Sequence, residues 1–336
     1  MPRAAWVAAP PTLVLLGPQR FDPILRQAVD ELGVDGPIAA VTAGWQEREG
    51  EDDELRAHLG GRTENLRLYA RCEEVFAADP ELFAAHRERQ NRLRELQRLY
   101  RIRLDHALAA VRTLQRERGG DPEILEPERK SAIEAVRALD AHHLARVAAL
   151  DRRFEDRWRP AERPAVARHR RELAADLAAC GALAIAGGHV AVLLNRLRLF
   201  GVVDLAAGKP IFAWSAGAMA LARRIVLFHD SPPQGAGNAE VLEQGLGVCP
   251  GVVPLPHASR RLRLDDPQRV SLFARRFQPL ACVALDPGTR LVFTSKQLVA
   301  ATGGRQLTAR SRIAELTPAA GTAAGARAGA AGETPR

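Results

Sequence analysis

The chain has 336 residues, of which 46% are hydrophobic and only 5% aromatic. A chain of this length can bury a large core, as one large domain or as one domain with an appendage, and that core must consist mainly of Ala, Leu and Val. The formal net charge is +8, but the arginines alternate with Glu and Asp, and no basic run is interleaved with aromatic residues. This pattern argues against nucleic-acid binding.

The four cysteines, Cys72, Cys180, Cys249 and Cys282, are far apart and form no C-x-x-C pair. This spacing argues against a zinc site or a disulfide framework and favours free thiols in a reducing compartment. The chain has no run of about 18 apolar residues that would cross a membrane, and its first residues do not resemble a signal peptide. We therefore expect a cytoplasmic protein with no metal and no membrane association.

Short apolar runs alternate with helical patterns in residues 1–79, the first part of the predicted α/β domain. Such alternation is typical of a mostly parallel sheet that is covered by helices on both faces. The fold class predicted from the sequence is accordingly α/β, with a mostly parallel sheet flanked by helices. The predicted strands are residues 12–17, 37–44 and 65–70, and helices are expected from about Asp22 to Gly33 and over residues 51–61.

Residues 80–160 break this alternation with two long stretches in which apolar residues recur every three or four positions. A Gly/Pro-rich segment, residues 119–127, separates the two stretches. The pattern predicts an antiparallel helical hairpin inserted into the α/β domain. Its expected role is stability or a homo-oligomer interface, with a roof over the site as the alternative. His142 and His143 are adjacent, so they do not share a helix face and do not suggest a metal pair.

The α/β pattern returns in residues 161–317. A helix is expected over residues 165–180, and a strand over residues 182–188 ends in two glycines. The strand 209–214 leads directly into Ser215. Further strands are expected at residues 282–286, 290–294 and 297–302, and the Ala/Gly-rich tail 318–336 is expected to be disordered.

Ser215 lies in the sequence Trp-Ser-Ala-Gly, between an apolar run and a helical pattern of small residues. Small residues around a serine at a strand-to-helix turn are typical of a nucleophile elbow, because the turn is strained and the helix packs close to the strand. The N–H of Ala216 would then be one oxyanion donor, and Gly188, at the end of the preceding strand, would supply a second. The alternative is a serine N-cap beside an ordinary glycine turn.

Two histidines downstream of Ser215 are candidates for the general base, His229 and His257. A base and the acid that orients it usually come from different loops. Asp230 directly follows His229 in the sequence, so we favour a triad of Ser215, His257 and Asp230.

Several segments resemble the aspartyl dipeptidase and cyanophycinase family of serine peptidases. They are "VTAGWQEREGEDDELRAHLG", "AIAGGHVAVLLNRL", "IFAWSAGAMAL", "GLGVCPGVVPLPHASRRLRL" and "ACVALDPGTRLVF". The resemblance covers about residues 12–70 and 165–310 and stops at the helical hairpin. It implies a class I glutamine-amidotransferase-like fold, with Ser215 as nucleophile and His257 as base.

The resemblance leaves the acid open. Asp230 matches the acid of the dipeptidase branch, whereas Asp286 matches that of the cyanophycinase branch. Arg261 and Arg263 match arginines that follow the family's histidine, and they are candidates either for binding a substrate carboxylate or for pairing with nearby aspartates, Asp265 and Asp266. His189 stands where the family commonly has Asn and is a further candidate for substrate binding.

The function implied is hydrolysis of peptide bonds next to aspartyl residues in a small peptide substrate. Acyl transfer by a Ser-His-Asp triad requires no metal or organic cofactor. The alternative is a non-catalytic binding or scaffold protein that assembles through the helical hairpin. Amide transfer of the glutamine amidotransferase type is disfavoured, because that chemistry normally uses Cys at the position of Ser215.

Overall fold

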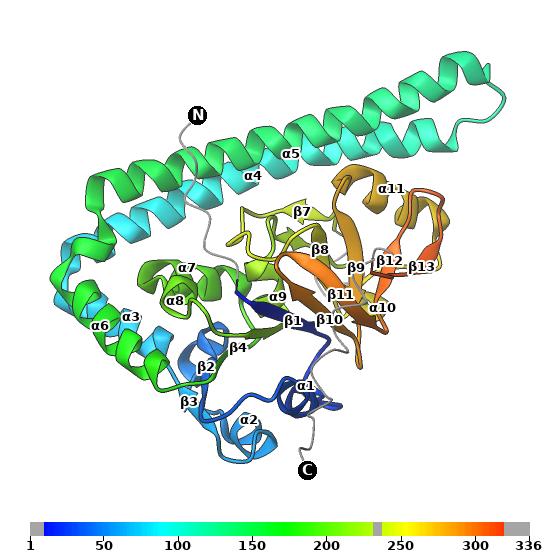
Figure 1. Ribbon diagram of the computed structural model, residues 1–336. Helices are drawn as coiled ribbons and strands as arrows, with labels where there is room; N and C mark the ends of the chain where they lie inside the picture. Colours follow the sequence, from blue (N-terminus) through cyan, green and yellow to red (C-terminus); the bar gives the residue numbers. More distant parts are fainter. Residues whose placement is uncertain (1–9, 231–236, 319–336) are drawn as a thin grey trace, which may run out of the picture.

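The computed structural model describes residues 10–230 and 237–318. Figure 1 shows two sheets beside one another and a long helical hairpin that runs across one side of the molecule. The α/β class, the mostly parallel sheet with flanking helices and the long helical insertion are all confirmed. The tail expected to be disordered lies, from residue 319 on, outside the described residues.

The larger sheet has seven strands in the order β11-β10-β1-β5-β4-β2-β3. Its five strands from β1 to β3 are parallel, and β10 and β11 run antiparallel along one edge. Their bounds are β1 Thr12–Leu16, β2 Ile38–Val41, β3 Thr63–Asn65, β4 Ala182–Ile185, β5 Ile211–Trp214, β10 Arg290–Thr294 and β11 Gln297–Thr302.

Alternate residues of the parallel strands point into two different cores, as the two-residue period of a strand requires. On one face, Leu13, Leu15 and Ile185 pack with residues of helices α3, α6, α7 and α9. On the other face, Leu16 and Phe212 pack with residues of helices α1 and α2. Burial on both faces explains why these strands appear in the sequence as continuous apolar runs.

The helices of this domain are α1 Leu25–Glu31, α2 Asp53–His58, α3 Leu68–Ala78, α6 Pro164–Ala178, α7 Val190–Phe200, α8 Val202–Leu205 and α9 Ala216–Leu221, with short 3-10 helices η1 Ala43–Arg48 and η2 Pro160–Glu162. The expected strand at residues 65–70 is wrong, because β3 ends at Asn65 and α3 begins at Leu68. The buried carboxylate of Glu49 accepts hydrogen bonds from the N–H groups of Tyr69 and Ala70 and so stabilises the start of α3.

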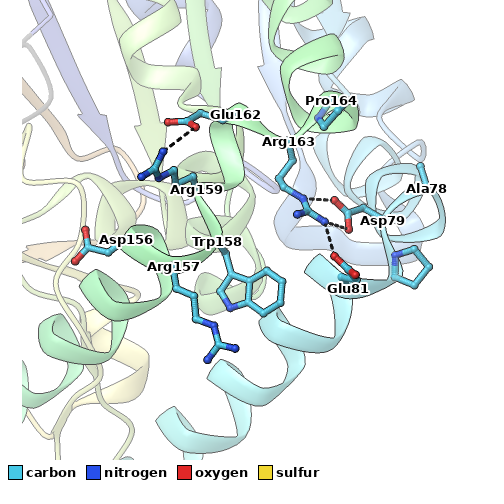
Figure 2. A pocket seen from close by; sticks show the side chains of 11 residues that line it. Ala78, Asp79, Glu81, Asp156, Arg157, Trp158, Arg159, Glu162, Arg163 and Pro164 are labelled. Carbon is cyan, nitrogen blue, oxygen red and sulfur yellow. Dashed lines mark hydrogen bonds and ion pairs between the residues drawn. The ribbon is translucent and has the colours of Figure 1, made fainter.

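The hairpin consists of α4 Pro80–Arg116 and α5 Pro122–Trp158. Asp79 caps α4 by accepting the N–H of Leu82, and the same carboxylate binds the Arg163 guanidinium at 2.5 and 2.6 Å. Figure 2 shows Arg163 between Asp79 and Glu81 at this junction. The start of the hairpin is thereby tied to the chain that leaves it.

The second sheet has the order β13-β12-β9-β8, and it was not expected as a separate sheet. Its strands are β8 Val252–Pro256, β9 Ala281–Leu285, β12 Arg305–Leu307 and β13 Ile313–Glu315; a ribbon of β6 Val226–Leu227 and β7 Glu240–Val241, and helices α10 Ala258–Arg261 and α11 Pro267–Phe277, lie with it. Leu104 and Val136 of the hairpin share a hydrophobic core with Leu255 of β8 and Phe273 of α11. The hairpin is therefore part of the core of this half of the molecule.

The four cysteines are buried and free. Burial raises the pKa of the Cys72 and Cys282 thiols to about 12, so these thiols are poor nucleophiles at neutral pH. Among the described helices, none combines the length and the apolar character needed to cross a bilayer.

Candidate active site

Ser215 occupies a strained turn between β5 and α9. Its backbone has φ 50° and ψ −121°, a conformation that residues with a side chain rarely adopt and that costs about 1–3 kcal/mol. Gly217 permits this tight turn, because a Cβ there would lie 2.3 Å from the carbonyl oxygen of Ile185 on β4. The strand-turn-helix context expected for a nucleophile elbow is therefore present.

His257 follows β8 and is the histidine that meets Ser215. Its Nε2 lies 3.3 Å from Ser215 Oγ, which is within the range of a nucleophile–base pair before substrate binds. His257 also has a left-handed backbone, with φ 57°. Both side chains are half-buried. The structure thus brings together two residues that are 42 positions apart in the sequence.

The environment of His257 favours the neutral imidazole. Burial lowers the pKa of His257, and the positive charges of Arg261 and Arg260 lower it further, while the negative charge of Asp286 acts in the opposite direction. A neutral imidazole is the form that accepts a proton from a serine hydroxyl.

The structure does not join Asp230 to His257. The Asp230 carboxylate is paired with the Arg269 guanidinium and accepts the N–H of Arg263 at 2.8 Å, and among the described residues no hydrogen bond links it to His257. Its charge is therefore already engaged in holding the loop after α10 against α11. His229, the other candidate base, directly precedes Asp230 in the sequence and is half-buried.

Asp286 lies beside His257 because β8 and β9 are parallel neighbours. Their register pairs Pro256 with Leu285, and the N–H of His257 donates to the carbonyl of Leu285 at 3.1 Å. The next residue on β9 is Asp286, whose carboxylate accepts the N–H and the hydroxyl of Ser259 at 3.0 and 2.7 Å. Arg305 of β12 donates to the same carboxylate at 2.6 Å, so the side chain of Asp286 is held in place. Among the described residues, no hydrogen bond links this carboxylate to His257 either.

The Gly187–Gly188 turn lies against Ser215. A Cβ on Gly187 would be 2.8 Å from Ser215 Cβ and 3.5 Å from the nitrogen of Ala216, so only glycine fits without displacing the turn. Gly44, after β2, supports it from the other side, because its carbonyl oxygen accepts the N–H of His189 at 2.7 Å. The first N–H groups of a helix have no acceptor within that helix, which suits Ala216 to the oxyanion role expected for it.

The candidate substrate-binding residues are arranged around this turn and around α10. His189 is exposed and caps α7, with its Nδ1 accepting the N–H of Val192 at 3.3 Å. Arg263 lies 3.7 Å from Asp266 and is exposed, so one of its expected alternatives, pairing with a nearby aspartate, is present. Arg261 is close enough to His257 to lower its pKa.

Three residues of this site were missed from the sequence. They are Gly44, whose carbonyl supports the glycine turn, and Ser259 and Arg305, which hold Asp286. The pattern Thr-Ala-Gly after a buried strand was a usable signal for Gly44. Ser259 and Arg305 had none, because their role depends on how distant strands pair.

Among the described residues, no group of three or more His, Cys, Asp or Glu side chains is arranged to hold a metal ion.

No protein-family model matches the chain, and no curated protein matches it. Among solved structures, a peptidase from an acI-B1 Actinobacterium is similar with a TM-score of 0.45 and 13% identity, over 92% of this chain and 96% of that chain. A putative Peptidase E protein from Listeria monocytogenes EGD-e has a TM-score of 0.28 and 18% identity, over 41% of this chain and 65% of that one. Both TM-scores lie below 0.5, so neither likeness assigns a fold family or an activity to this chain.

Proposed function

We propose that the protein is a serine hydrolase of peptide bonds, with Ser215 as nucleophile and His257 as general base. The single observation that carries this proposal is the 3.3 Å approach of His257 Nε2 to the hydroxyl of a serine held in a strained elbow. Backbone strain at a non-glycine residue persists only where the surrounding structure enforces it, and it concentrates at functional sites.

In this mechanism Ser215 Oγ attacks the peptide carbonyl while His257 takes the hydroxyl proton, and the N–H groups of Ala216 and Gly188 bind the oxyanion. His257 then gives the proton to the leaving amine, and the acyl group stays on Ser215 as an ester. Water, deprotonated by His257, hydrolyses the ester and returns Ser215 to its starting state. We assign the orienting acid to Asp286. Each aspartate is paired with an arginine, Asp286 with Arg305 and Asp230 with Arg269, but Asp286 flanks His257 on the neighbouring strand and its charge acts on the pKa of His257.

The sequence segments around these residues resemble the aspartyl dipeptidase and cyanophycinase family, and we propose the corresponding class I glutamine-amidotransferase-like fold. The substrate would then be a small peptide cleaved beside an aspartyl residue. Arg261, near His257, is the cation best placed to attract such a carboxylate.

Labelling with a serine-directed phosphonate, read by intact mass, tests the proposal. The native chain should gain one adduct, Ser215→Ala none, and His257→Ala should react about 10²–10⁴-fold more slowly. Ser131→Ala, at an exposed position on the hairpin, should react like the native chain. A folded native chain that takes up no adduct would instead favour the binding or scaffold role.

The two candidate acids are separated by the same reaction. Asp286→Asn should slow labelling markedly, whereas Asp230→Asn should act mainly on the stability of the loop that Asp230 ties to Arg269. The opposite order of effects would return the acid role to Asp230. Aspartyl dipeptides and matched asparaginyl dipeptides, compared as substrates, then test the substrate class.

A further inference from the structure

Two cavities outside the Ser215 site differ in how their charges are balanced. The larger, of about 690 Å³, lies at the base of the hairpin. Two of its three arginines pair with carboxylates, as Figure 2 shows: Arg163 with Asp79 and Glu81, and Arg159 with Glu162. The third, Arg157, lies over the ring of Trp158. The lining of this cavity holds four carboxylates against three arginines, so it offers no excess of positive charge to an anion, and it is best understood as the clamp at the start of the hairpin.

The second cavity, of about 360 Å³, lies between the end of α4 and the start of α11. Two elements far apart in the sequence therefore face each other across it. Its charged lining consists of four arginines and two aspartates: Arg112, Arg116, Arg263, Arg269, Asp230 and Asp266.

The two aspartates are already occupied. Asp230 pairs with Arg269, and Asp266 lies 3.7 Å from Arg263 while its Oδ1 accepts the N–H groups of Gln268 and Arg269 at the start of α11. The hairpin contributes two more cations, Arg112 and Arg116, and among the described residues neither forms an ion pair with a carboxylate.

Arg112 shows the effect of this imbalance. It is half-buried, and the polar contact of its guanidinium is with the neutral amide oxygen of Asn238, whose own amide donates to Asp105 at 2.6 Å. Burial lowers the pKa of Arg112, and the charge of Arg269 lowers it further, more than the attraction of Asp105 and Asp230 can offset. A partly buried cation in a predominantly positive cavity is stabilised by an anion that enters it.

We propose that this cavity binds a small multivalent anion, a ligand with two or more phosphate or carboxylate groups, held between Arg112 and Arg116 of the hairpin and Arg263 and Arg269 of the body. The amides of Gln115, Gln268 and Asn238 lie in the same wall and supply neutral donors. The hairpin and the body each contribute two arginines, which matches a ligand that carries two anionic groups. A chloride or an acetate carries only one such group.

The site is connected to the candidate active site through one residue. Asp230 lines the cavity and donates its backbone N–H to the carbonyl of Arg261, the last residue of α10, at 2.7 Å. His257 is the N-cap residue of α10, directly before its first residue. The cavity therefore adjoins the segment that carries His257.

Calorimetric titration of the full chain at low salt tests the proposal, with inorganic pyrophosphate and citrate as separate probes for phosphate and carboxylate ligands. We expect saturable binding of at least one probe, weakened about tenfold or more in Arg112→Gln and in Arg116→Gln. A tenfold loss corresponds to about 1.4 kcal/mol, which is within the range for a charged hydrogen bond. Binding is read directly, so the result is independent of whether Ser215 is a nucleophile.

Two control variants identify the place of binding. Arg103→Gln removes an exposed charge of the same helix outside the cavity, and Arg261→Gln removes the cation beside His257; both should bind the probe as the native chain does. Absence of saturable binding overturns the proposal, as does equal binding in the native chain and in both cavity variants. A loss in Arg103→Gln as large as in Arg112→Gln would show attraction by net charge alone, and a selective loss in Arg261→Gln would place the anion at the Ser215 site.

Discussion

The two sheets of this protein are stabilised by different kinds of side chain. In the seven-stranded sheet, strands β2, β4 and β5 contribute only Ala, Val, Leu, Ile, Phe and Trp. In the half that includes the hairpin, the apolar core encloses a group of polar side chains, namely Tyr100, Asp140, His143 and Arg276. The central strands of the larger sheet therefore depend on burial of apolar area, whereas the core that the hairpin shares with the second sheet depends also on the pairing of buried charges.

The buried polar group joins three elements. Arg276 of α11 binds both oxygens of Asp140 on α5 at 2.7 Å and also donates to the hydroxyl of Tyr100 on α4 at 2.9 Å. His143 stacks on Tyr100 with ring centroids 4.2 Å apart, and its Nε2 lies 3.0 Å from the carbonyl oxygen of Leu242. Because each hydrogen bond has a specific direction, this group sets the position of the hairpin on the second sheet more strictly than apolar contact would.

The largest expected effect comes from leaving one of these charges alone. Asp140→Leu or Arg276→Met should each lower the free energy of unfolding by about 3–5 kcal/mol, because the partner charge remains buried without compensation. The double variant should lose less than either single variant, because both charges are gone. Urea unfolding of the three variants measures this; additive losses would mean that the pair is not coupled.

The seven-stranded sheet should respond to volume instead. Leu15 is fully buried in the central strand β1, and Leu15→Ala should lower the free energy of unfolding by about 2–5 kcal/mol through lost burial and the cavity that remains. Leu99→Ala is the matched control on the hairpin, where the side chain is 46% exposed; its effect should stay within about 0.5 kcal/mol. Equal losses in the two variants would contradict the placement of these residues.

The same contrast explains which parts of the fold could be predicted from the sequence. The parallel strands and the hairpin were recognised, because apolar runs and three-four spacing are local signals. Residues 65–70 were misassigned, because Leu66 and Leu68 fit a strand as well as a helix start, and the deciding contact comes from Glu49. Strand β8 was missed because two of its five residues are prolines, which normally argue against a strand.

In the candidate site, too, local signals could be recognised from the sequence and non-local contacts could not. Ser215 and His257 were identified from local motifs, and the structure brings them together. The choice between Asp230 and Asp286 depends on the parallel pairing of β8 with β9, which no local pattern encodes. The supports of Asp286, Ser259 and Arg305, belong to the same non-local arrangement.

A smaller effect is expected at the base of the hairpin, where His86 packs 5.1 Å from the Phe76 ring. Burial, with the charges of Arg89 and Arg196, lowers the pKa of His86 to about 3, against about 6.5 in the unfolded chain. The unfolded chain therefore binds this proton first, so stability is retained above pH 6.5 and is lost progressively as the pH falls from 6.5 toward 3. Between pH 7 and 5 the native chain should lose about 2 kcal/mol more than His86→Leu in urea unfolding. An equal loss in both chains would show that His86 is accessible to protons when folded.

The smallest effects should be shifts in the pH dependence of phosphonate labelling. These shifts should have opposite signs when a positive and when a negative charge near His257 is removed. Labelling needs neutral His257, so its acidic limb should lie below the usual histidine pKa of about 6.5, since burial lowers the pKa. Arg261→Gln removes a positive charge, raises the pKa and should move the limb to higher pH. Asp286→Asn removes a negative charge, lowers the pKa and should move the limb to lower pH, in addition to slowing the reaction. Shifts in the same direction, or none, would mean that the charges on α10 and β9 do not act on His257, and the base would then have to be sought elsewhere in the site.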